Sequence, residues 1–176
     1  MKVRNMSESK AIFIDVSKCI GCRACEVACE RVHNGKSFIN VNIIEDFRLS
    51  IPLNCRHCEK APCMIVCPTD AIYRDSDGAI IVNPILCIGC RLCVIACPFG
   101  VPEFDRELKI MIKCDLCQDR RAKGLNPACV STCPTDALIY ASVEEYRETK
   151  QKMVISKIIE EARTKKEILK LGNIKV

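Results

Sequence analysis

The cysteines constrain this chain more than any other feature, because sixteen of its 176 residues are cysteine. At that frequency cysteine chemistry normally decides how a short chain folds. The cysteines form four groups of four: Cys19, Cys22, Cys25 and Cys29; Cys55, Cys58, Cys63 and Cys67; Cys87, Cys90, Cys93 and Cys97; and Cys114, Cys117, Cys129 and Cys133. The first and third groups share the spacing C-x2-C-x2-C-x3-C, whereas the middle gap widens in the second and fourth.

This spacing is the one by which bacterial ferredoxins hold [4Fe–4S] clusters. Three closely spaced thiolates bind one cluster, and the fourth cysteine, followed by proline, binds the other cluster of a pair. Proline follows the last cysteine of three groups, at Pro68, Pro98 and Pro134. The sequence therefore predicts four [4Fe–4S] clusters, with all sixteen cysteines as iron ligands.

A structural zinc-binding assembly protein is the alternative, because two separated C-x2-C pairs make tetrahedral zinc sites. The fourth group alone fits that pattern, but the first and third leave no separated second pair. A secreted disulfide scaffold is disfavoured, because residues 1–10 are polar and lack the apolar segment of a signal peptide. These observations favour a cytoplasmic protein, whose thiols stay reduced.

Two repeats indicate that the chain is duplicated. Cys-Ile-Gly-Cys-Arg-x-Cys begins at Cys19 and again at Cys87, and Cys-Pro-Thr-Asp-Ala begins at Cys67 and again at Cys133. Between the second and third groups, residues 71–83 form two apolar runs joined by Ser-Asp-Gly, which predicts a β-hairpin. Cysteine group, hairpin, cysteine group is the order of a small two-cluster ferredoxin.

We therefore predict an α+β fold of two interleaved bacterial-ferredoxin-like units with short hairpins. Residues 55–97 form an inner unit with two clusters, and residues 11–29 together with 114–140 form an outer unit with the other two. Residues 30–54, which read as strand-like, and residues 98–113 connect the units.

The crossing of each fourth cysteine predicts the ligand sets. They are set A, Cys19, Cys22, Cys25 and Cys133; set B, Cys114, Cys117, Cys129 and Cys29; set C, Cys55, Cys58, Cys63 and Cys97; and set D, Cys87, Cys90, Cys93 and Cys67. A weaker alternative pairs neighbouring groups, the first with the second and the third with the fourth.

Residues 143–171 lack cysteine and proline and predict a long amphipathic C-terminal helix. Ser142 and Glu145 form a capping-box pattern at its start, and Gly172 with Asn173 is a stop signal. An apolar stripe consists of Val154, Ile155, Ile158, Ile159 and Ala162. The stripe either packs on its own domain or contacts another protein, and we predict docking or oligomerisation.

Other segments carry weaker predictions. His57 either tunes a cluster or relays a proton, or it is a hydrogen-bonded loop residue, which the sequence favours. The polar insert at residues 118–128 is favoured as a solvated loop over a surface that steers an acidic partner. The side chains expected to shield the clusters are Ile20, Val66, Ile88, Val94 and Ile95.

Composition excludes several functions. The formal charge of +5 treats every cysteine as neutral, and with sixteen thiolates and four cluster cores the total becomes about −3, so it does not indicate a nucleic-acid partner. No uncharged stretch approaches the roughly 20 residues of a membrane span. The sequence shows no nucleotide-binding loop, flavin fingerprint, acid–base pair or nucleophile motif.

The motifs resemble a known family of four-cluster iron–sulfur subunits. They are Cys-Arg-His-Cys-Glu-Lys-Ala-Pro-Cys in the second group, Ala-Cys-Pro-Phe-Gly at the end of the third, and Lys-Cys-Asp-Leu-Cys at the start of the fourth. The family includes electron-transfer subunits of formate dehydrogenases, formate-linked hydrogenases, carbon monoxide dehydrogenases and the dimethyl sulfoxide reductase group. The resemblance covers residues 11–140 and implies a line of clusters between a catalytic subunit and an acceptor.

We therefore expect a non-catalytic subunit that carries single electrons through four [4Fe–4S] clusters. Formate dehydrogenase or hydrogenase is the expected catalytic partner, carbon monoxide dehydrogenase the next, and a molybdopterin reductase the third. A second redox subunit or carrier completes the expected hetero-oligomer, which is cytoplasmic and at most peripheral to a membrane.

Overall fold

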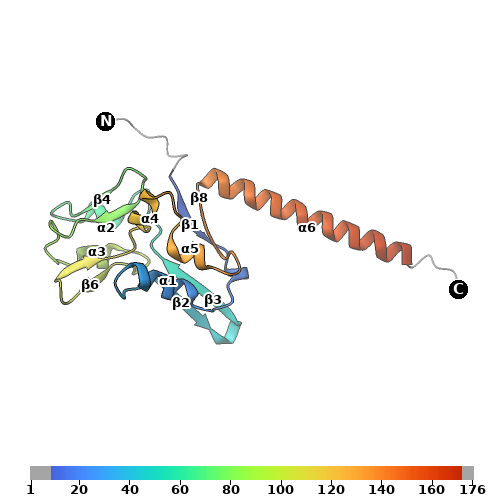
Figure 1. Cartoon of the computed structure of the whole chain (residues 1–176), viewed down its shortest axis with the longest axis horizontal. Coiled ribbons are helices and arrows are strands. Elements are labelled where there is room, and N and C mark those ends of the chain that lie inside the picture. Colours follow the sequence, from blue (N-terminus) through green and yellow to red (C-terminus); the bar gives the residue numbers. More distant parts are fainter. Residues whose placement is uncertain (1–8, 172–176) are drawn as a thin grey trace.

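The computed structural model describes residues 9–171, and side chains as far as residue 164. Within this part of the protein, short strands pair into four two-stranded antiparallel sheets (Figure 1). The strands are β1 (Ala11–Ile14), β2 (Ile39–Ile44), β3 (Leu49–Asn54), β4 (Ile72–Arg74), β5 (Ile80–Val82), β6 (Glu103–Asp105), β7 (Ile110–Ile112) and β8 (Leu138–Ala141). The helices are α1 (Ala24–Val32), α2 (Pro62–Ile65), α3 (Leu92–Ala96), α4 (Gln118–Ala122), α5 (Ala128–Thr132) and α6 (Val143–Leu171), with 3-10 turns η2 (Val16–Lys18) and η3 (Glu45–Phe47). The predicted mixture of helix and sheet with a long C-terminal helix is confirmed, whereas the duplication stays a prediction.

The two ends of the cysteine-containing region lie together. β1 pairs with β8, from Ala11 opposite Ala141 to Ile14 opposite Leu138, and α1 packs against α5. The segment 30–54 adds the β2–β3 hairpin to this region. The first and fourth cysteine groups, far apart in sequence, therefore share one core.

The middle two groups form a second core. β4 and β5 make the hairpin predicted in residues 71–83, and α2 packs against α3. The segment 98–113, expected only to connect the units, forms the β6–β7 hairpin, and its Met111 is buried in this second core. Ala79 and Ile81 of the inner hairpin reach into the first core, so the two cores are in contact.

Helix α6 is anchored at its start and then leaves the body of the molecule (Figure 1). The predicted capping box is present: the backbone N–H of Glu145 donates to Ser142 Oγ at 3.1 Å, and the Ser142 N–H donates to Glu145 Oε2 at 2.9 Å. Tyr146 stacks on Phe13 of β1 at 4.0 Å between ring centroids, and Lys150 pairs with Asp15 at 2.8 Å.

Beyond this anchor the apolar stripe of α6 faces solvent. Val154, Ile155, Ile158 and Ile159 are all about half exposed or more, so the stripe finds no partner among the described residues. The predicted stop at Gly172 lies outside the described residues. None of the helices described is long and apolar enough to cross a membrane.

Candidate metal centres

The cysteine groups begin on tight loops and continue into short helices. The helical cysteines are Cys25 and Cys29 on α1, Cys63 on α2, Cys93 on α3 and Cys129 on α5. Gly21 and Gly89 turn the first and third loops with φ of 70° and 67°. At Gly89 the carbonyl oxygen of Lys109 occupies the space that a Cβ would need. Glycine is therefore required at position 89, because its φ is positive and because the Lys109 carbonyl leaves no room for a side chain.

Two pockets are each lined by the four cysteines of one predicted set. One holds set A, Cys19, Cys22, Cys25 and Cys133. The other holds set C, Cys55, Cys58, Cys63 and Cys97. In each pocket one cysteine comes from a group distant in sequence, which is the arrangement that the crossing pattern predicts.

The cysteines of set B lie near one another in the interior. The thiol of Cys29 lies close enough to Cys117 and Cys129 for their charges to interact. Cys114 interacts in the same way with Cys129. All four of these thiols belong to buried residues.

The cysteines of set D lie on the third loop and at the end of α2. The charge of Cys93 interacts with those of Cys87 and Cys90. Cys67 packs against the same buried core as Cys87. The backbone N–H of Met111 donates to the Cys87 sulfur at 3.3 Å.

The chemistry of these sulfurs fits iron–sulfur clusters. Burial raises the pKa of Cys25 and Cys93 to about 11 and that of Cys129 to about 12, so a free thiolate is costly at these positions, whereas a bound metal compensates its charge. Backbone N–H groups also donate to sulfur, which stabilises negative charge there. These donors are Phe38 to Cys29, His57 to Cys55, Ala128 to Cys117 and Ala137 to Cys133, at 3.2 to 3.5 Å.

Three of the side chains expected to shield clusters face solvent. Ile20 and Ile88 are each 66% exposed and Ile95 is 83% exposed, while Val66 and Val94 are half-buried. Ile20 nevertheless lines the pocket that contains the set A cysteines. Shielding of the clusters by these side chains stays a prediction.

His33 links two cysteine groups, a role that the sequence analysis did not anticipate. Its Nδ1 lies 2.9 Å from the carbonyl oxygen of Cys29, and its Nε2 lies 3.0 Å from Asp115 Oδ1. The hydrogen bond with Asp115, with a further one to Cys29, raises the pKa of His33 to about 11. His33, Asp115 and Cys117 are grouped closely enough to hold a metal ion, but Cys117 is a predicted iron ligand of set B.

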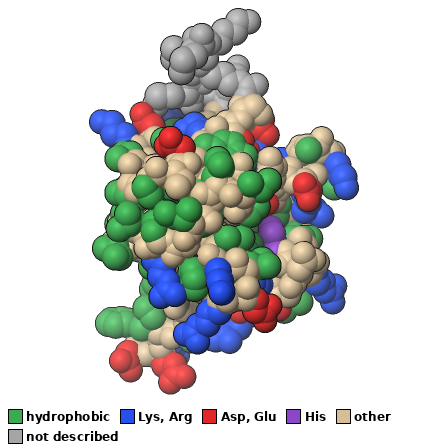
Figure 2. All heavy atoms as spheres, turned by 90° about the vertical axis from the view of Figure 1, so that its left-hand side faces the viewer, with side chains coloured by type: hydrophobic (Ala, Val, Ile, Leu, Met, Phe, Trp, Pro, Cys, Tyr) green, Lys and Arg blue, Asp and Glu red, His purple; other side chains and the backbone are tan. Residues whose placement is uncertain are grey.

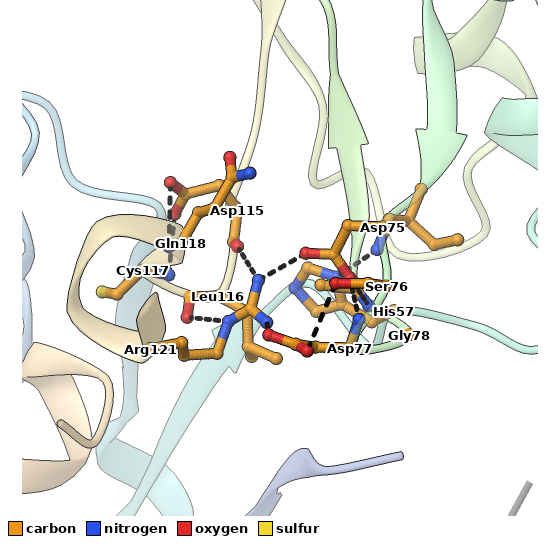
Figure 3. Close-up of polar contacts among 12 residues, drawn as sticks. His57, Asp75, Ser76, Asp77, Gly78, Asp115, Leu116, Cys117, Gln118 and Arg121 are labelled. Atoms are coloured by element: carbon orange, nitrogen blue, oxygen red, sulfur yellow. Dashed lines mark hydrogen bonds and ion pairs between the residues drawn. The ribbon is translucent and has the colours of Figure 1, made fainter. Parts of the chain in front are cut away.

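Arg121 joins the two cores (Figure 3). Its guanidinium donates to Asp75 Oδ2 and Asp77 Oδ2, both at 2.6 Å, in the turn of the β4–β5 hairpin. It also donates to the carbonyl oxygen of Leu116 at 3.0 Å. The Arg121 side chain is only 4% exposed, so the prediction of a solvated loop is wrong for this residue, which pairs internally.

His57 is buried beside the same hairpin (Figure 3). Its Nδ1 accepts a hydrogen bond from the Ile80 N–H at 3.0 Å, and its Nε2 has no hydrogen-bond partner. Burial, with the nearby charges of Lys113 and Arg121, lowers the pKa of His57 to about 3. The imidazole is therefore neutral at physiological pH, which leaves its Nδ1 able to accept this hydrogen bond.

The sequence is similar to those of known iron–sulfur proteins. A 4Fe-4S dicluster domain model matches residues 47–143, and a 4Fe-4S binding domain model matches residues 16–32. The protein is 40% identical over 155 residues to the thiosulfate reductase electron transfer subunit PhsB of Salmonella typhi, covering 81% of each sequence. It is 36% identical to the B subunit of anaerobic dimethyl sulfoxide reductase of Escherichia coli K12, covering 81% of this sequence and 78% of that one. It is also 36% identical to the B subunit of polysulfide reductase of Wolinella succinogenes, covering 86% of each sequence.

The matched domains and the sixteen cysteines support four [4Fe–4S] clusters as the cofactors. This prediction from the spacing is confirmed. The zinc alternative has no support, because both matched domain types are iron–sulfur domains.

Proposed function

Because this protein belongs to the family of 4Fe-4S ferredoxin-type electron-transfer subunits, we propose that it passes single electrons through its clusters to or from a catalytic reductase subunit that acts on a sulfur compound. The protein itself is a non-catalytic subunit of an oxidoreductase complex, as the sequence predicted. The protein's part in such chemistry is to position the clusters, exclude water and tune their potentials.

The proposed ligand sets A, B, C and D follow one another as a line. The observation that carries this proposal is that each set has a cysteine whose charge interacts with one of the next set. Cys25 of set A interacts with Cys129 of set B, and Cys114 of set B interacts with Cys55 of set C. Cys63 of set C interacts with Cys93 of set D. With clusters bound, this arrangement would carry electrons in the order A, B, C, D, or in reverse.

The two ends of this line reach the surface. Cys22 of set A and Cys90 of set D are the exposed cysteines, whereas the thiols of set B are buried. Apolar side chains lie exposed in the third cysteine group and its flanks, including Ile85 at 90% and Ile95 at 83%, and Figure 2 shows hydrophobic side chains gathered on this side of the molecule. A docked redox partner would cover such side chains and exclude water from the terminal cluster.

The choice of catalytic partner rests on the relatives. Thiosulfate reductase, dimethyl sulfoxide reductase and polysulfide reductase are all named among them, which favours the molybdopterin reductase class that the sequence ranked third. Formate dehydrogenase and hydrogenase, which the sequence ranked first, have no support among these relatives. The cytoplasmic location and the second redox subunit stay predictions.

Anaerobic purification from the native source tests the function. We expect about sixteen iron and sixteen acid-labile sulfide per protein molecule, since each cluster holds about four of each, together with a co-purifying subunit that reduces thiosulfate, polysulfide or a sulfoxide. Reduced clusters should be reoxidised when that substrate is added. A co-purifying formate dehydrogenase would contradict the proposed partner, and zinc without sulfide would contradict the electron-transfer function.

The projecting part of α6 provides a separate test of assembly. Truncation after Lys152 keeps the Tyr146 and Lys150 anchors but removes the exposed apolar stripe. We expect full iron content and a lower mass of the complex by light scattering, because the stripe has no partner among the described residues. An Ile155→Leu variant, which keeps the stripe apolar, should assemble normally. Unchanged mass of the truncated complex would reject the docking role of α6.

A further inference from the structure

Lys113 is a buried lysine between two of the proposed cluster sites. It follows β7 and is 5% exposed. Its Nζ donates to the carbonyl oxygen of Ile80 and, at 2.9 Å, to that of Cys114. The same Nζ lies 3.8 Å from the sulfur of Cys55.

These contacts fit a charged ammonium group. A protonated lysine has three N–H donors and no acceptor, and Lys113 has three acceptors around it. None of the ion pairs among the described residues gives it a carboxylate partner. The negative charge nearest to the Lys113 ammonium is therefore that of the cysteine sulfur.

Lys113 also lies where the line of clusters crosses from one core to the other. Cys55 belongs to set C, and Cys114, the residue next to Lys113, belongs to set B. The ammonium thus lies at the crossing, and the sulfur that it contacts is on the set C side.

We propose that Lys113 raises the reduction potential of the set C cluster and so favours electron transfer from set B to set C. The proposal rests on the electron-transfer function and on the ligand sets given above. With clusters held by these cysteines, an electron moving from set B to set C would oxidise the first cluster and reduce the second. Lys113 keeps its proton, and no bond is made or broken.

The physical reason is the charge of the reduced cluster. A cluster with four thiolate ligands carries a net negative charge, which increases by one on reduction. A fixed positive charge a few ångströms away, screened little in the interior, stabilises the more negative state. Lys113 therefore acts by placing a positive charge beside the cluster site and is not a ligand of the iron.

The test compares Lys113→Met with Lys123→Met in the complete complex. Lys123 is exposed and serves as the matched control. Anaerobic redox titration followed by electron paramagnetic resonance measures the midpoint potentials. In Lys113→Met one of them should be lower by about 59 mV or more, which for one electron is a tenfold change in the reduced-to-oxidised ratio. The signal that moves should be the one that is lost in a Cys58→Ala variant.

Iron analysis separates the possible outcomes. Four unchanged potentials in a Lys113→Met protein with full iron would overturn the proposal while leaving the electron-transfer function intact. Wild-type protein without iron would instead refute the function itself. If Lys113→Met loses iron, the Lys113→Arg variant separates charge from packing. A full iron content at wild-type potentials in Lys113→Arg supports the role of the charge. Iron loss from Lys113→Arg as well shows that Lys113 acts only by packing.

Discussion

Replacing Cys133 with alanine is expected to remove one cluster, about four of the sixteen iron atoms, and that cluster should be the one held by Cys19, Cys22 and Cys25. The reason is geometric, because Cys133 lines the same pocket as those three cysteines although more than a hundred residues separate it from them. Alanine is preferred to serine, since a serine oxygen can replace sulfur at iron. Iron and sulfide analysis of anaerobically purified protein measures the loss.

Double variants distinguish this assignment from the pairing of neighbouring groups. If Cys133 and Cys22 bind one cluster, Cys133→Ala with Cys22→Ala loses no more iron than either change alone. Combining Cys133→Ala with Cys90→Ala should instead remove two clusters, because Cys90 belongs to set D. The opposite result, with the Cys90 pair losing only one cluster, would show that the third and fourth groups are paired and that the crossing assignment is wrong.

Features set by short stretches of sequence were predictable. The hairpin in residues 71–83 and the capping box of Ser142 with Glu145 depend on residues a few positions apart, and both are present. The number and kind of clusters followed from cysteine spacing, because a tight loop around iron requires that spacing. The β6–β7 hairpin escaped prediction, since the Arg-Glu-Leu-Lys segment between its strands lacks the glycine turn signal that Ser-Asp-Gly gives to the β4–β5 hairpin.

Features that depend on distant contacts could not be predicted. Arg120 and Arg121 are adjacent and chemically identical in sequence. The Arg120 side chain donates to the carbonyl oxygen of the exposed Asn126, whereas the Arg121 side chain is buried against Asp75, 46 residues away. In the sequence, Lys113 is distinguished only as the first residue of the Lys-Cys-Asp-Leu-Cys motif. Its role emerges when the fold brings Cys55 and Ile80 to its ammonium group.

Replacing the buried Arg121 is expected to lower the thermal stability of the protein strongly. Arg121→Met leaves the Asp75 carboxylate, which is 10% exposed, without its cation in the interior between the two cores. Breaking a buried ion pair by removing one partner costs about 3 to 5 kcal/mol. For a protein of this size, 1 kcal/mol shifts the denaturation midpoint by about 2 to 4 °C, so we expect a fall of roughly 6 to 12 °C at the lower end of that cost.

The measurement is anaerobic thermal denaturation at one fixed scan rate, followed by loss of the cluster absorption, because cluster loss makes unfolding irreversible. Arg120→Met is the matched control and should change the midpoint by no more than about 1 °C, since an exposed interaction contributes little. Equal midpoints for the two variants would show that Arg121 does not hold the cores together.

A compensating change separates the lost ion pair from lost packing. Asp75→Asn removes the negative charge, and its side-chain oxygen can still accept the hydrogen bonds that Asp75 Oδ1 receives from the Asp77 and Ala79 N–H groups at 2.9 and 2.8 Å. Arg121→Met with Asp75→Asn should therefore regain part of the lost midpoint, because no buried charge remains unpaired. If the double variant melts as low as Arg121→Met alone, the arginine acts mainly through its hydrogen bond to the Leu116 carbonyl oxygen and its packing rather than through charge.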